Sequence, residues 1–114
     1  MYSDKEGNSL RDIIGFIDEV QDYAGGMDRD AFSADRRTLR AVESCLQNLT
    51  EAAIRVGEAR WEALVGTADF HRVRGLGNRL RHEYDRIDAL SIYELIDAHL
   101  DDLRSACVAA LDSR

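Results

Sequence analysis

The sequence has no proline among its 114 residues, and it has no long apolar run. No stretch approaches the roughly 18 consecutive apolar residues that a membrane-spanning helix needs. The first ten residues, MYSDKEGNSL, lack the basic start and the apolar core of a secretory signal peptide. These absences predict a cytoplasmic protein with no membrane association.

Signals for β-structure are also missing. No run of residues alternates between β-branched and polar side chains, and no Asn-Gly pair marks a tight hairpin. Apolar residues recur instead at intervals of three and four, which is the period of an α-helix. The chain is therefore expected to be all-α.

Motifs for metal or cofactor chemistry are absent. The two cysteines, Cys45 and Cys107, form no C-x-x-C pair, which argues against a disulfide framework or a zinc site. A di-iron site between helices would need Glu-x-x-His on two helices, and neither copy is present. His71 and His82 stand about 16 Å apart along one expected helix, so they cannot share an ion. We expect no metal and no cofactor, and both thiols are interpreted as reduced core residues.

Nucleophile and phosphate-loop signatures are missing too. The sequence contains neither G-x-S-x-G nor a Gly-rich phosphate loop. His99 lies in an apolar stripe near Asp101 and Asp102, and it is interpreted as a packing or capping residue.

Four helices are expected from the apolar periodicity and the cap residues. The first runs from an N-cap at Ser9 to Gly25-Gly26, the second from Ser33 or Asp35 to about Gly57, the third from about Phe70 to Tyr84, and the fourth from Asp88 or Ser91 to the C-terminus. Residues 27–34 form a connector with room for a short turn, and residues 58–68 form another, in which Trp61 packs over the end of the bundle.

Helices with connectors this short predict an antiparallel four-helix up-and-down bundle. In the second helix, the apolar residues form a seam with alternating gaps of three and four, which suits packing at a shallow angle: Leu39, Val42, Leu46, Leu49, Ala53 and Val56. Residues 1–114 are expected to form one domain, with residues 1–8 and 112–114 frayed.

Charge is distributed unevenly along the chain. The formal net charge is −7, yet residues 71–86 contain five arginines against Glu83 and Asp85, so this stretch carries +3 and the remainder −10. A local basic strip on an acidic body suits a confined anionic ligand better than a long duplex. The alternative is that the strip is simply one solvated helix face.

The residues of that strip can support acid–base chemistry on a phosphodiester. On a helix, His82 is a neighbour of both Asn78 and Arg79. Histidine can move a proton to or from an RNA oxygen, and arginine can hold a phosphate. One such histidine per chain is sparse, and a symmetric dimer would supply a second. Gly77 leaves the backbone open and weakens the helix by about 1 kcal/mol relative to alanine, which indicates either a functional approach or close helix packing.

The motif GNRLRHEY, with RAVESCLQNLTEAA upstream, resembles the HepT-like branch of the HEPN superfamily. The resemblance extends over SLRDIIGFIDEVQDYAGG, AFSADRRTLRAVE, the segment around Glu51, and IYELIDAHLDDL. It implies a four-helix bundle that forms a homodimer, with the paired motifs facing a shared cleft. Such proteins are typically metal-independent ribonucleases that act as toxins. Their partner is an MNT-type nucleotidyltransferase antitoxin, which transfers AMP to the tyrosine of the motif.

The family motif has Arg, a polar residue, three to five further residues, His, any residue and Tyr. Here Asn78, His82 and Tyr84 match, whereas Gly77 occupies the position of the arginine. The resemblance and the local chemistry together assign His82, Asn78 and Arg79 to catalysis, Tyr84 to modification, Arg74, Arg81 and Arg86 to phosphate or RNA binding, and Glu51 to support of the cleft. The alternative is a catalytically degenerate HEPN protein that binds a nucleotide or a nucleotidyltransferase without cleaving RNA.

Overall fold

The computed structural model describes residues 2–66, 70–82 and 88–113, and of residues 81 and 82 it describes only the backbone. Within these ranges the chain forms no strand and six helices: α1 (Asp4–Ala24), α2 (Arg29–Ala34), α3 (Arg36–Val56), α4 (Glu58–Val65), α5 (Phe70–His82) and α6 (Ala89–Asp112). The expected all-α class is confirmed.

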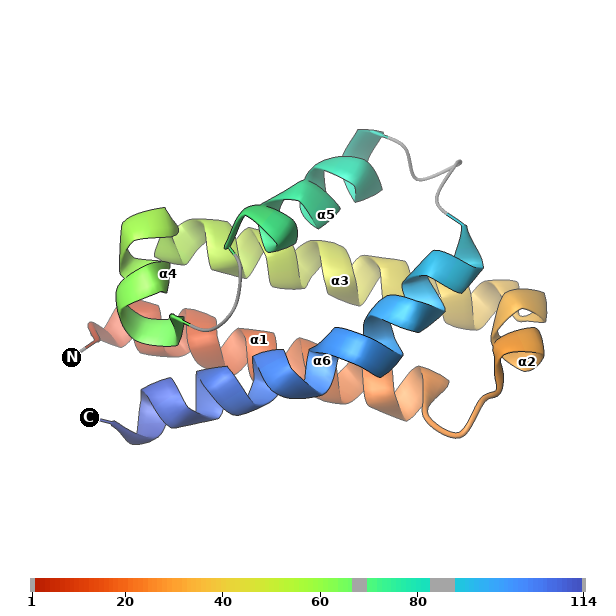
Figure 1. Ribbon diagram of the computed structural model, residues 1–114, viewed down its shortest axis with the longest axis horizontal. Coiled ribbons are helices and arrows are strands. Elements are labelled where there is room, and N and C mark those ends of the chain that lie inside the picture. Colours follow the sequence, from red (N-terminus) through yellow and green to blue (C-terminus); the bar gives the residue numbers. More distant parts are fainter. Residues whose placement is uncertain (1, 67–69, 83–87, 114) are drawn as a thin grey trace.

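The long helices α1, α3, α5 and α6 run alternately in opposite directions (Figure 1). Helix α1 packs against both α3 and α6, and α5 packs against α3. The short helices α2 and α4 lie at opposite ends of the molecule (Figure 1). This arrangement is the expected helical bundle, with two additional short helices in its connections.

Helix α1 begins earlier than its predicted N-cap. Ser3 is the N-cap, its hydroxyl accepts a hydrogen bond from the Glu6 amide, and the Glu6 carboxylate accepts one from the Ser3 amide. This reciprocal pair is a capping box, and it satisfies backbone donors that a helix start otherwise leaves unpaired. The prediction of Ser9 was therefore wrong, because Ser9 is buried within the helix. Residues 4–8, expected to fray, are helical, and the Tyr2 hydroxyl donates to the Leu111 carbonyl at 2.9 Å.

The predicted ends of α3 are confirmed. The Asp35 carboxylate accepts a hydrogen bond from the Thr38 amide at 3.0 Å, which lowers the pKa of that carboxyl. Gly57 ends the helix with φ at +86°, a left-handed conformation that glycine adopts without strain. The apolar seam of α3 is buried apart from Leu39, which is partly exposed.

Both predicted connectors contain helix. The segment 27–34 holds α2, where Phe32 is fully buried and its ring lies 5.6 Å from that of Tyr93. The segment 58–68 was predicted to be a connector, and within it Glu58–Val65 forms α4, a helix that was not predicted. Trp61 and Val65, one helical turn apart, are both buried, and this shared apolar face stabilises the extra helix. Trp61 covers the end of the bundle as expected.

Helix α6 begins at the first of its two predicted caps. The Asp88 carboxylate accepts a hydrogen bond from the Leu90 amide at 3.0 Å, whereas Ser91 lies within the helix. Cys107 of α6 and Cys45 of α3 are buried free thiols, as expected. Within the described ranges, none of the helices combines the length and the apolar character that a bilayer-spanning segment requires.

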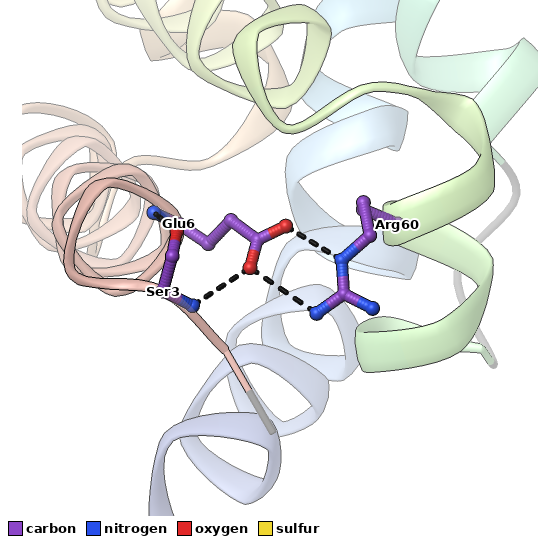
Figure 2. A network of polar contacts seen from close by, with 3 residues as sticks. All are labelled: Ser3, Glu6 and Arg60. Atoms are coloured by element: carbon purple, nitrogen blue, oxygen red, sulfur yellow. Dashed lines mark hydrogen bonds and ion pairs between the residues drawn. The ribbon is translucent and has the colours of Figure 1, made fainter.

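Glu6 connects α1 to α4 as well as capping α1. Its carboxylate accepts two hydrogen bonds from the Arg60 guanidinium, at 2.7 Å from Nε and 3.2 Å from Nη2, in addition to the one from the Ser3 amide (Figure 2). The Arg60 hydrogen bonds, followed by that of Ser3, lower the pKa of Glu6 from 4.5 to about 2. The charged form of Glu6 therefore stabilises the packing of α4 against the start of the chain.

Replacement of Glu6 should make the stability less dependent on acid pH. A carboxyl group with a depressed pKa contributes its stabilisation fully above its unfolded value and loses it as the pH falls through the folded value. The free energy of unfolding of the parent should thus exceed that of Glu6→Gln at pH 7, and the difference should shrink between pH 4.5 and about 2. Urea unfolding of both proteins across this pH range measures the difference in the free energy of unfolding. In an Arg60→Gln background the same change should have little further effect, and a full-size effect there would contradict the assignment.

Candidate functional site

Helix α5 carries most of the residues that the sequence assigns to function. Arg74, Asn78 and Arg79 are exposed on it. His82 is the last residue described as helical, and its side chain, like that of Arg81, lies outside the described atoms. The other predicted residues of the motif region, Tyr84 and Arg86, lie outside the described residues.

The helical geometry places three of these residues in one row. Successive residues turn by about 100°, so positions 74, 78 and 82 follow one another in steps of about 40°. Arg79 lies about 60° from His82 on the neighbouring side of the helix. Position 78 therefore lies between positions 74 and 82 in this row, and Arg79 lies about one turn before position 82.

Arg74 is positioned by an aromatic ring one turn earlier. Its guanidinium carbon lies 5.9 Å from the centroid of the Phe70 ring, within the range of a cation–π interaction. Phe70 is itself buried, with its ring 6.1 Å from that of Trp61. The aromatic pair at the bundle end therefore supports the first cation of the row.

Gly77 lies on a different side of α5, where the helix packs against α3. A Cβ atom at this position would stand 2.5 Å from Thr50 Oγ1 and 2.9 Å from Thr50 Cβ. Thr50 is fully buried, and its hydroxyl donates to the Gln47 carbonyl at 2.8 Å. Close helix packing, one of the two readings of this glycine, therefore explains its presence. A side chain at position 77, arginine included, requires α5 or Thr50 to move.

Glu51, the predicted support of the cleft, is the residue after Thr50 and is exposed on α3. It lies next to the contact between α3 and α5 but turned by about 100° from it. Its role in supporting the cleft stays a prediction.

A pocket between α5 and α6 was not predicted from the sequence. It has a volume of about 550 Å³, and Leu46 and Leu49 of α3 are among the residues that line it. Arg72 of α5 and His99 of α6 both line it, and Arg72 Nη2 lies 3.4 Å from His99 Nε2. Since arginine can only donate, the imidazole nitrogen accepts. His99 was interpreted as a packing or capping residue, but its side chain is exposed at this pocket and it lies within α6 rather than at an end of the helix.

Sequence reasoning missed the pocket for a physical reason. The residues that form it come from three helices, and the two polar partners are 27 positions apart. The apolar periodicity of each helix identifies which side faces the core, but it does not reveal where two neighbouring helices fail to close on each other.

Other reactive groups are occupied or unreactive. His71 Nε2 lies 2.7 Å from a carboxylate oxygen of Glu58. Burial raises the pKa of the Cys107 thiol to about 12. The Cys45 thiol donates a hydrogen bond to the Glu19 carboxylate, and burial together with this carboxylate raises the pKa of Cys45 to about 11. Neither thiol is a nucleophile at neutral pH. In the described part of the chain, no group of three or more His, Cys, Asp or Glu residues is arranged to hold a metal ion.

Comparison with known proteins shows a family match over most of the chain. Residues 13–110 match the family model described as "Ribonuclease HepT-like". A protein of Methanocaldococcus jannaschii named "Putative RNase MJ0125" is 23% identical over 95 residues, which cover 83% of this chain and 81% of that protein. No solved structure matches the chain significantly.

Two glycines of α5 should respond oppositely to replacement by alanine. Gly77→Ala forces a Cβ against Thr50, and because Thr50 Cβ is fixed to the backbone, side-chain rotation cannot relieve the contact. We expect a loss of about 1–3 kcal/mol in the free energy of unfolding. A Cβ at Gly75 meets nothing within 4 Å, so Gly75→Ala should stabilise the protein by about 0.5–1 kcal/mol.

Urea unfolding of both variants measures these changes. Thr50→Gly should remove most of the penalty of Gly77→Ala when the two are combined. Equal effects of the two alanine substitutions, or no rescue by Thr50→Gly, would contradict the close contact.

Proposed function

Because the chain belongs to the HepT-like ribonuclease family, we propose that it is a metal-independent RNA endonuclease that acts as the toxin of a toxin–antitoxin pair. The observation that carries the proposal is the match of residues 13–110 to a ribonuclease family model. The spacing of Asn78 and His82 on α5, one turn apart and beside exposed arginines, supports it.

In the proposed reaction, His82 serves as the acid and base. It takes the proton of a ribose 2′-hydroxyl, whose oxygen then bonds to the adjacent phosphorus. The bond from phosphorus to the 5′-oxygen breaks, and the leaving oxygen takes up a proton, which yields a 2′,3′-cyclic phosphate and a free 5′-hydroxyl. Asn78 positions the reacting groups, and Arg79 stabilises the charge that develops on the phosphate.

The packing of α5 supports the choice of Arg79, which lies two residues after position 77, where the family motif has its arginine. Position 77 faces Thr50, whereas Arg74 is exposed within the row that leads to His82 and Arg79 is exposed beside that row. Arg79 is the nearer of the two to His82 along the helix. We therefore assign the phosphate contact in the transition state to Arg79, and substrate binding to Arg74, Arg81 and Arg86.

The proposed enzyme is a homodimer. A single His82 must act both as base and as acid, and two copies facing one cleft would supply one histidine for each step. Glu51, beside the contact between α3 and α5, would hold the shape of this cleft. The proposed partner is an MNT-type nucleotidyltransferase antitoxin.

A second candidate function follows from Gly77. The family places an arginine at this position, and its loss favours a catalytically degenerate protein that binds a nucleotide or the nucleotidyltransferase through the same surface. Restoring the arginine alone is a poor test, because the side chain meets Thr50. The double variant with Thr50→Gly and Gly77→Arg separates the candidates. If the double variant cleaves RNA and the parent does not, the parent is catalytically degenerate.

Removal of the imidazole should abolish cleavage. The purified protein should cleave RNA in the presence of EDTA, and His82→Ala should lower the rate by roughly 10²–10⁴-fold. Arg79→Ala should lower it by about a hundredfold, whereas Arg74→Ala should mainly weaken substrate binding. Initial rates at varied RNA concentrations separate the two effects. Cleavage that requires a divalent metal ion, or that proceeds at an undiminished rate in His82→Ala, would refute the mechanism.

Modification of Tyr84 should inactivate the enzyme. Transfer of AMP to its hydroxyl would place a bulky anion within a basic cleft and repel the substrate phosphate. Incubation with ATP and the cognate nucleotidyltransferase should add the mass of AMP to the parent but not to Tyr84→Phe, as read from intact mass. Tyr84→Phe should still cleave RNA after this treatment. Transfer to Tyr84→Phe would show that another residue is the acceptor.

A further inference from the structure

The pocket between α5 and α6 combines an apolar interior with a charged rim. Its leucine side chains come from three helices: Leu46 and Leu49 of α3, Leu76 of α5, and Leu95, Leu100 and Leu103 of α6. The polar residues that line it are Arg72, His99, Asp102 and Ser105. A volume of about 550 Å³ lies within the range of sites that enclose small organic molecules.

We propose that this pocket receives one unpaired nucleobase of the RNA, at a site beside the scissile bond. The inference rests on the proposed ribonuclease function and adds a substrate-binding site to it. Bases that leave the helical stack are commonly held between apolar side chains with polar groups at their edges. The leucine interior can cover the faces of a base, and the polar rim can contact its edge and the attached phosphate.

The pocket lining carries a cation, Arg72, and a carboxylate, Asp102, which suits a ligand with both an anionic group and hydrogen-bond donors better than an uncharged apolar ligand. The described sequence of α5 contains no acidic residue, and Arg72 projects from it to the rim of the pocket. The guanidinium of Arg72 lies 3.4 Å from His99 Nε2, so the imidazole helps to position it. A cation placed in this way at the mouth of an apolar pocket suits a ligand that is flat and apolar at one end and anionic at the other.

The position along α5 indicates which nucleotide would be held. Arg72 and Leu76 precede His82 by ten and six residues, or about 15 and 9 Å along the helix axis. The base in the pocket therefore belongs to a nucleotide near the scissile phosphate rather than to the reacting pair itself. Such a site would select sequence on one side of the cleavage point.

Asp102 determines the expected base preference. A carboxylate only accepts hydrogen bonds, and carboxylates accept from the exocyclic amino groups of bases. Adenine, cytosine and guanine carry such a group. Uracil has no exocyclic amino group, and its one donor on this edge, N3–H, lies between two carbonyl oxygens that a carboxylate repels. Oligoadenylate should therefore bind more tightly than oligouridylate.

The test measures binding without turnover. Fluorescein-labelled ten-nucleotide oligoadenylate and oligouridylate are titrated with the full-length protein in a His82→Ala background, and fluorescence anisotropy is recorded. Ala106→Phe fills the pocket, which Ala106 lines, and should weaken oligoadenylate binding about tenfold, as expected for loss of one bound base. Ala109→Phe, at an exposed position of the same helix, is the matched control and should bind like its parent.

Two further variants address folding and base preference. Because Ala106 is partly buried, Ser105→Phe, at an exposed position that also lines the pocket, provides a second obstruction with less risk to the core. Asp102→Ala should abolish the preference for oligoadenylate without weakening oligouridylate binding. Thermal unfolding of each variant establishes that it is folded.

The outcomes separate this site from the proposed function. If the parent cleaves RNA but both obstructing variants bind oligoadenylate normally, the pocket is not a base site and the nuclease assignment stands. If oligoadenylate binding depends on the pocket but the parent never cleaves RNA, the site stands and the nuclease assignment fails. If Ala106→Phe halves the molar mass measured by light scattering and binding falls with it, the pocket is a contact between copies, which overturns the inference.

Discussion

The contact between Gly77 and Thr50 determines how α5 sits on the rest of the bundle. With no Cβ at position 77, the two helices approach until the glycine lies against a fully buried threonine. This contact sets the rotation of α5 about its own axis. The exposed row at positions 74, 78 and 82, and the pocket side that carries Arg72, follow from that rotation because a rigid helix turns all of its side chains together.

The same contact clarifies the departure from the family motif. In a helix, a glycine costs about 1 kcal/mol relative to alanine, and here close packing between two helices offsets that cost. An arginine could be accommodated only by a different side chain at position 50 or a larger separation of the helices. Positions 77 and 50 therefore form a coupled pair, and the phosphate contact of a nuclease built on this chain must come from another arginine.

The bundle closes tightly on one side and remains open on the other. Helix α1 packs against α3 and α6, and both ends of the molecule are covered by short helices. Between α5 and α6, Arg72 contacts His99, and beside this contact lies a pocket lined by leucines from three helices. In a single chain this is the place where apolar side chains border a basic helix, so it is a natural position for a ligand with both characters.

Several features could be read from the sequence, because each depends on interactions within a few residues. They are the helical class, the periods of the core-facing residues, the caps at Asp35, Gly57 and Asp88, and the composition of the basic strip. The helix at Glu58–Val65 and the start of α1 at Ser3 were missed: the first is stabilised by burial of Trp61, and the second by a capping box with Glu6 that lies upstream of the apolar stripe. Only the tertiary structure decided that Gly77 faces Thr50, that His99 meets Arg72, and that a pocket separates α5 from α6. These features depend on how helices distant in sequence rotate and approach one another, and local periodicity contains no information about that.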